Sequence, residues 1–147
     1  MIRFLPGPDL DDTKNSWIVD DGRPPRHQFK GYHLDSLQRP TFIYRFDNVR
    51  VEDYCVDLID ASSGAPTLKR KIRFESEMPR NGLAFRVASG SSIEKVDDTR
   101  FRLNQKLLVQ VDDQHAAEIV DSADETRLVV PLRLAAGVTE LEVHYSW

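Results

Sequence analysis

The chain has 147 residues, of which 40% are hydrophobic and 30% charged, and its formal net charge is −4. This length suits one domain with one hydrophobic core, and the balance of apolar and charged residues excludes a disordered chain. Basic residues are scattered along the chain, which argues against nucleic acid as a partner because phosphate binding needs a concentrated basic face. No apolar run approaches the about 18 residues of a membrane helix, so no membrane insertion is expected.

Residues 1–28 show neither the helical nor the strand periodicity. They contain the prolines Pro6, Pro8, Pro24 and Pro25. This composition predicts an irregular arm or linker, followed by a β-domain at residues 29–147. We expect Trp17 to dock the arm onto that domain, because exposed tryptophan in a linker is unusual. Since the first residues form no apolar signal segment, the chain is interpreted as either cytoplasmic or part of a longer secreted polypeptide.

From residue 29 onward, apolar and polar residues alternate with a period of two. The alternating segments are residues 41–46, 68–75, 83–87, 107–111, 128–134 and 141–147. Turn-forming pairs such as Asn81-Gly82 separate them. Alternation of this kind is typical of antiparallel strands with one buried and one wetted face. We therefore predict an all-β antiparallel sandwich, with the longer strands also suiting a supersandwich of the galactose-mutarotase type.

Two segments depart from simple alternation. In residues 49–59, Val49 and Val51 have one parity and Tyr54 and Val56 the other, which predicts a β-bulge near Glu52–Asp53. A proline within an otherwise strong strand pattern, Pro131, predicts an edge strand or a bulge. The single cysteine, Cys55, excludes an internal disulfide, and its apolar surroundings predict a buried, inert thiol.

His33 and Asp35 occupy alternate positions, so on a strand they share a face. With Glu52 or Asp53 they would allow the His–carboxylate or two-carboxylate pair that sugar chemistry uses. The spacing is not specific, and the favoured interpretation is a solvated strand end for His33 and a turn cap for Asp35. No nucleophile elbow or phosphate loop is present, so we predict no catalytic residue and no enzyme activity for this domain alone.

Metal and cofactor sites are not predicted either. The four histidines are far apart in the sequence, and the Asp112-Asp113 pair is typical of a hairpin tip rather than of a calcium site. The candidate ligand-binding residues are aromatic or polar side chains in the first part of the chain. They are Trp17, Tyr32, His33, Asp35 and Tyr54. The basic strip at residues 69–73 is interpreted as a solvated face, with a docking surface for an acidic partner as the alternative.

Several stretches together follow one pattern. They are residues 29–35, 39–45, 49–53, 68–70, 82–86 and 145–147. The pattern resembles a β-rich module of large secreted proteins of planctomycete-type bacteria, where it accompanies β-propeller dehydrogenase-like and c-type cytochrome domains. The resemblance implies a secreted or periplasmic setting and a parent protein linked to sugar oxidation or degradation. It supplies no catalytic residues, and the chain lacks the Cys-x-x-Cys-His of haem attachment, so no cofactor is expected.

Three functions remain open, each with its own structural expectation. A non-catalytic accessory module that packs against other domains of its polypeptide predicts a large patch on one face and no ligand cleft. A carbohydrate-binding module predicts exposed aromatic residues flanked by polar groups on a concave sheet. A mutarotase-like enzyme predicts a buried carboxylate with a strongly perturbed pKa. The accessory module is favoured, with carbohydrate binding as the alternative.

Overall fold

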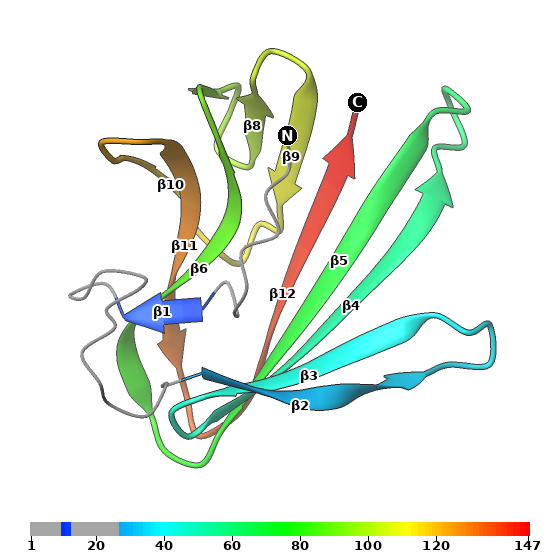
Figure 1. Cartoon of the computed structure of the whole chain (residues 1–147). Helices are drawn as coiled ribbons and strands as arrows, with labels where there is room; N and C mark the ends of the chain where they lie inside the picture. Colours follow the sequence, from blue (N-terminus) through cyan, green and yellow to red (C-terminus); the bar gives the residue numbers. More distant parts are fainter. Residues whose placement is uncertain (1–9, 13–26) are drawn as a thin grey trace.

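The computed structural model describes residues 10–12 and 27–147, which form two antiparallel β-sheets (Figure 1). Within these ranges there is no helix, and therefore none that could span a membrane. The larger sheet consists of β2 (His27–Leu34), β3 (Pro40–Phe46), β4 (Val49–Ile59), β5 (Pro66–Ser76), β12 (Gly137–Ser146), β9 (Leu107–Val111), β8 (Arg100–Leu103) and β7 (Ile93–Lys95), in that spatial order. The smaller sheet consists of β1 (Leu10–Asp12), β6 (Arg80–Gly90), β11 (Thr126–Leu134) and β10 (Glu118–Asp121). The predicted all-β antiparallel class is confirmed.

The predicted N-terminal arm, residues 1–28, lies mostly outside the described residues, and Trp17 with it. Two parts of it are described. Leu10–Asp12 pair with β6 as the edge strand β1, and His27 and Gln28 already belong to β2. These parts of the segment are therefore strands of the domain.

The core lies between the facing surfaces of the two sheets. Alternate side chains of β4, β5, β9 and β12 pack against those of β6 and β11, as the alternation of the sequence predicts. Phe74 of the larger sheet meets Phe85 of the smaller one edge to face, with ring centroids 5.6 Å apart. The Tyr145 hydroxyl donates a hydrogen bond of 2.8 Å to the carbonyl of Val87 and so also joins the sheets.

The bulge predicted in β4 is wrong. β4 pairs in unbroken register with both β3 and β5. Asp53, a buried acidic residue, occupies the inner position that follows Val49 and Val51, whereas Tyr54 faces outward. The apparent change of parity arises because a charged residue takes an inner position. The register shift of this region lies instead in β2, between Phe29 and Gly31, and Gly31 has a φ of 118°.

Pro131 lies in β11, which is flanked by β6 and β10, so the prediction of an edge strand is wrong. The alternative, a bulged strand, is confirmed by register shifts against β6 at Leu128/Val129 and at Leu132/Leu134. β10 pairs with β11 only as far as Val129. Pro131 therefore lies where β11 has one paired neighbour, and a missing backbone donor is tolerated there.

The larger sheet extends beyond the sheet that covers it. In Figure 1 the ends of the β2–β3 and β4–β5 hairpins project away from β6, β10 and β11. Burial along β4 follows this geometry, because Val49, Val51 and Asp53 are buried whereas Cys55 and Ile59 on the same face are exposed. About half of β4 thus belongs to the sandwich and half to an uncovered extension.

Truncating an aromatic residue of the core tests this division. Phe74→Ala removes a fully buried ring, and we expect the free energy of unfolding to fall by about 3–5 kcal/mol. Phe29→Ala, on the extension, removes a ring that is 65% exposed and should change it by no more than about 0.5 kcal/mol. Urea denaturation monitored by tryptophan fluorescence measures both values. Similar losses for the two variants would show that the extension is part of the core.

Candidate functional site

The candidate ligand-binding residues are divided between two faces of the larger sheet. Tyr32 pairs with Phe42 and faces inward, toward the side that carries the core. His33, Asp35 and Tyr54 lie on the outer face, where His33 and Tyr54 flank Thr41 in a cross-strand row. The structure thus brings three of the candidates together and places Tyr32 on the opposite side, while Trp17 is outside the described residues.

Asp35 anchors the turn between β2 and β3. Its Oδ1 accepts hydrogen bonds from the backbone amides of Leu37 (2.8 Å) and Arg39 (3.0 Å). Its Oδ2 accepts hydrogen bonds from the Arg39 guanidinium (2.8 Å) and from the Tyr54 hydroxyl (3.1 Å). These bonds, the Arg39 amide first among them, lower the pKa of Asp35 to about 2 even though desolvation opposes the shift. A carboxylate that stays ionised in this way serves as a turn cap and not as a general acid.

Several charged pairs also lie on the rest of the outer face. Glu52 accepts a hydrogen bond of 2.8 Å from Arg50 and lies 3.6 Å from Arg73; the bond from Arg50 is the main reason its pKa is lowered. Farther along the sheet, Glu142 pairs with Lys69 at 3.0 Å and with His144 at 2.9 Å. Neutralised pairs of this kind are typical of a face in contact with water.

The basic strip of β5 does not form one surface. Lys69, Lys71 and Arg73 lie outward, whereas Arg70 lies on the inner face opposite Cys55. The Arg70 guanidinium binds both carboxylate oxygens of Asp53, with Nε at 2.9 and 3.2 Å. The side chains of Arg70 and Asp53 are only 15% and 11% exposed, and Arg70 also lies 5.0 Å from the centre of the Phe85 ring. The pair therefore closes the core at the boundary with the extension.

Beyond this ion pair the inner face is exposed and mostly apolar, although Asp57 lies on it between Cys55 and Ile59. We call this surface the extension patch. It comprises Phe29, Tyr32, Leu34, Phe42 and Ile59, which are between 45% and 77% exposed. Tyr32 and Phe42 touch across β2 and β3, with ring centroids 6.2 Å apart. Single exposed apolar side chains are ordinary, but several large ones on one face of a sheet indicate an interaction surface.

Cys55 also lies on the inner face next to the extension patch and is exposed, so the prediction of a buried thiol is wrong. The apolar segment that suggested burial is the part of β4 that extends beyond the smaller sheet. Partial desolvation and then the charge of Asp53 raise the pKa of Cys55, so the thiol form dominates at neutral pH.

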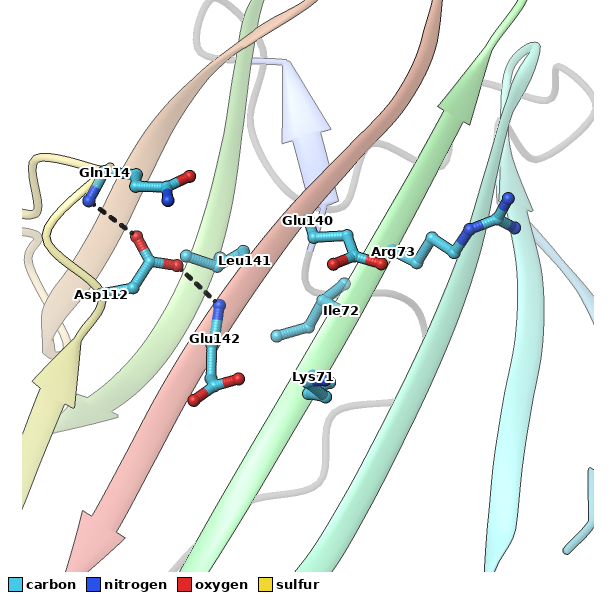
Figure 2. Close-up of a pocket in the computed structure, with 8 residues that line it drawn as sticks. All are labelled: Lys71, Ile72, Arg73, Asp112, Gln114, Glu140, Leu141 and Glu142. Carbon is cyan, nitrogen blue, oxygen red and sulfur yellow. Dashed lines mark hydrogen bonds between the residues drawn. The ribbon is translucent and has the colours of Figure 1, made fainter.

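A hollow of about 280 Å³ lies on the outer face, where β5 and β12 meet the loop after β9 (Figure 2). We call it the outer hollow. It is lined by Lys71, Ile72, Arg73, Asp112, Gln114, Glu140, Leu141 and Glu142. Asp112 holds the loop in place, because its Oδ2 accepts a hydrogen bond of 2.8 Å from the Glu142 amide and its Oδ1 one of 3.1 Å from the Gln114 amide. The hollow is therefore built on fixed backbone.

Asp112 also lies 2.7 Å from the Nδ1 atom of His115. Both of its carboxylate oxygens are thus engaged within the protein. Among the described residues no group of three or more histidine, cysteine, aspartate or glutamate side chains is placed to hold a metal ion.

The sequence did not identify the extension patch or the outer hollow. The shift between Phe29 and Gly31 breaks the period of two in β2, so Phe29 and Tyr32 share a face although their sequence spacing places them on opposite faces. The outer hollow joins residues of three segments far apart in the chain, of which the sequence singled out Asp112 and the basic strip. No protein-family model matches this chain, and no curated protein or solved structure shows a significant similarity to it.

Removing the carboxylate of Asp53 would leave the Arg70 charge in a largely buried position. We expect Asp53→Ala to lower the free energy of unfolding by about 3–5 kcal/mol, the usual cost of breaking a buried pair. Glu75→Ala removes an exposed partner of Arg73 and should cost less than about 1 kcal/mol. Urea denaturation of both variants tests this, and equal small losses would show that the Asp53–Arg70 pair is not needed to close the core.

The lowered pKa of Asp35 has a consequence for acid stability. The usual pKa of 3.8 is lowered to about 2 in the folded protein, so the carboxylate contributes stability above about pH 4 and this contribution is lost as the pH falls toward 2. The stability difference between the native protein and Asp35→Asn should be constant above pH 4 and disappear over that acid range. NMR titration of the Asp35 carboxyl carbon measures the pKa directly, and a value near 3.8 would contradict the assigned hydrogen bonds.

Proposed function

We propose that this chain is a non-catalytic accessory module of a large secreted multidomain protein linked to sugar oxidation or degradation. It packs against another domain of that polypeptide through the extension patch. The observation that carries the proposal is the exposed apolar group on the inner face of β2, β3 and β4, which the smaller sheet leaves uncovered. The setting and the parent protein come from the sequence resemblance.

The chemistry of the patch favours a protein partner over a carbohydrate at this face. The inner positions of β2 and β3 beyond the core are Phe29, Tyr32, Leu34, Pro40 and Phe42. None carries a charge or an amide, whereas sugar hydroxyls need polar partners for binding. Of the charged groups on this face, Asp53 and Arg70 bind each other, whereas Asp57 lies farther along β4, between Cys55 and Ile59.

The carboxylates support a role without catalysis. A mutarotase-like enzyme predicts a buried carboxylate with a strongly perturbed pKa. Asp53 is the buried carboxylate among the described residues, and it is bound to Arg70. The other candidate carboxylates have lowered pKa values. Asp35 accepts hydrogen bonds from backbone amides and from the Arg39 side chain, and Glu52 accepts them from the Arg50 side chain.

Because the strands of the larger sheet are longer than the sheet that covers them, we also propose a supersandwich as the complete architecture. The strands β4 and β5 continue past the smaller sheet, and a further layer over the extension patch would bury the apolar side chains that are exposed on this face. In this proposal the neighbouring domain supplies that layer, which is why the isolated chain exposes it.

Cys55 offers a direct test, because it is the single cysteine and adjoins the extension patch. The other domains of the parent polypeptide are produced separately and mixed with this chain. We expect the domain that binds to slow the reaction of Cys55 with a maleimide at least tenfold. Phe42→Asp places a charge in the patch and should abolish both the binding and the protection. Glu140→Gln, on the outer face, is the matched control and should retain both.

Binding that survives Phe42→Asp, or binding that leaves Cys55 fully reactive, would show that the partner uses another surface. If none of the neighbouring domains binds, the accessory role is wrong.

A further inference from the structure

The outer hollow lies on the opposite face from the extension patch, so a partner on the inner face leaves it open. Lys71 and Arg73 come from β5, Glu140 and Glu142 from β12, and Gln114 from the loop after β9 (Figure 2). The hollow is thus independent of the proposed docking surface.

Some polar side chains of the hollow have unused hydrogen-bonding capacity. Within the described part of the chain, the side chains of Lys71, Gln114 and Glu140 make no hydrogen bond or ion pair. Together they offer an ammonium, an amide and a carboxylate, which supply both donors and acceptors. The remaining charged residues are already engaged, Arg73 with Glu75 and Glu142 with Lys69 and His144.

The backbone around the hollow is held in place before any ligand arrives. Asp112 and Glu142 bind each other twice, through the Asp112 amide and the Glu142 carbonyl at 3.0 Å and through the Glu142 amide and the Asp112 carboxylate at 2.8 Å. The backbone of Gln114 is fixed to the same carboxylate. Binding therefore requires little ordering of the loop backbone, which lowers its entropic cost.

The mixture of charges selects the class of ligand. An anion near Lys71 would be repelled by Glu140, Glu142 and Asp112, and a cation near these carboxylates would be repelled by Lys71 and Arg73. A neutral polyhydroxylated ring avoids both penalties, because each hydroxyl donates to a carboxylate or accepts from an ammonium or amide. We infer that the outer hollow binds a single sugar ring, free or as a residue of a longer carbohydrate.

The hollow is small and open, which sets the affinity to be expected. Its volume of about 280 Å³ is just below the usual range for ligand sites, so it accommodates one ring. A site this open leaves much of the ligand in water. We expect weak binding, with a Kd on the order of 1 mM.

The test is a titration of the whole chain, labelled with ¹⁵N, followed by NMR. The probes are glucose, galactose, xylose, and the neutral disaccharides cellobiose and lactose, each raised to about 0.1 M, a hundredfold above the expected Kd. We expect at least one of them to shift amide signals of residues 71–73, 112–114 and 140–142 in a saturable way. Signals of Tyr32 and Phe42, on the extension patch, should not move.

Variants and competing probes decide the outcome. Glu140→Ala and Lys71→Ala should each weaken binding at least fivefold, whereas Glu94→Ala, on the outer face of β7, is the matched control and should bind as the native protein does. All three positions are exposed, so these changes should leave the fold intact. The inference is overturned if no probe shifts these signals at 0.1 M, or if inorganic phosphate, acetate or calcium shifts them at lower concentrations than any sugar. Because the readout is confined to the outer face, failure here leaves the docking proposal standing.

Discussion

The ion pair between Asp53 and Arg70 is the point at which the sandwich ends. On the side of the pair toward the core, Val51, Ile72 and Phe74 are almost completely inaccessible to solvent. On its other side, Cys55 is exposed. The pair satisfies two charges that would otherwise be buried without a partner, and Arg70 stacks on Phe85 of the facing sheet. The charged pair lies at the edge of the hydrophobic core, so the larger sheet continues past it although the solvent-excluded core does not.

This boundary explains why the two halves of the larger sheet have different surfaces. Where β6 and β11 cover the sheet, its inner face is packed and its outer face carries paired charges such as Lys69 with Glu142. Past the ion pair the inner face of β2, β3 and β4 remains mostly apolar, apart from Asp57, but the smaller sheet does not cover it. Exposed apolar side chains on one face reduce solubility unless something covers them, which is the physical basis of the proposed docking of another domain.

The hairpins of the extension have internal anchors that replace the missing second layer. Asp35 binds the β2–β3 turn and reaches Tyr54 on the next strand, so the tip of this hairpin stays attached to β4. Asp60 has the same role in the β4–β5 turn, where it accepts hydrogen bonds from the Ser62 hydroxyl and from the amides of Ser62 and Ser63. The bond from the Ser62 hydroxyl, followed by those from the amides, lowers the pKa of Asp60 to about 2. Turn carboxylates therefore keep the extension ordered enough to present a preformed surface.

The sequence by itself determined the class of the fold, because the period of two depends only on which side chains avoid water. It also placed turns such as Asp47-Asn48, but Asn81-Gly82 is not a turn: it lies within β6, where Gly82 has a φ of 79°. The sequence predicted the irregularity at Pro131, since a missing amide is a local property. The tertiary structure decided which strands have a partner layer. Cys55 and Phe42 have the same apolar surroundings in the sequence as core residues do, but the smaller sheet ends before it reaches them. The tertiary structure also decided which side chains face inward at two places. The ion pair with Arg70 keeps the charged Asp53 at an inner position of β4, and the register shift in β2 puts Phe29 on the same face as Tyr32. The outer hollow was beyond sequence analysis for the same reason, since it exists only where β5, β12 and the loop after β9 converge.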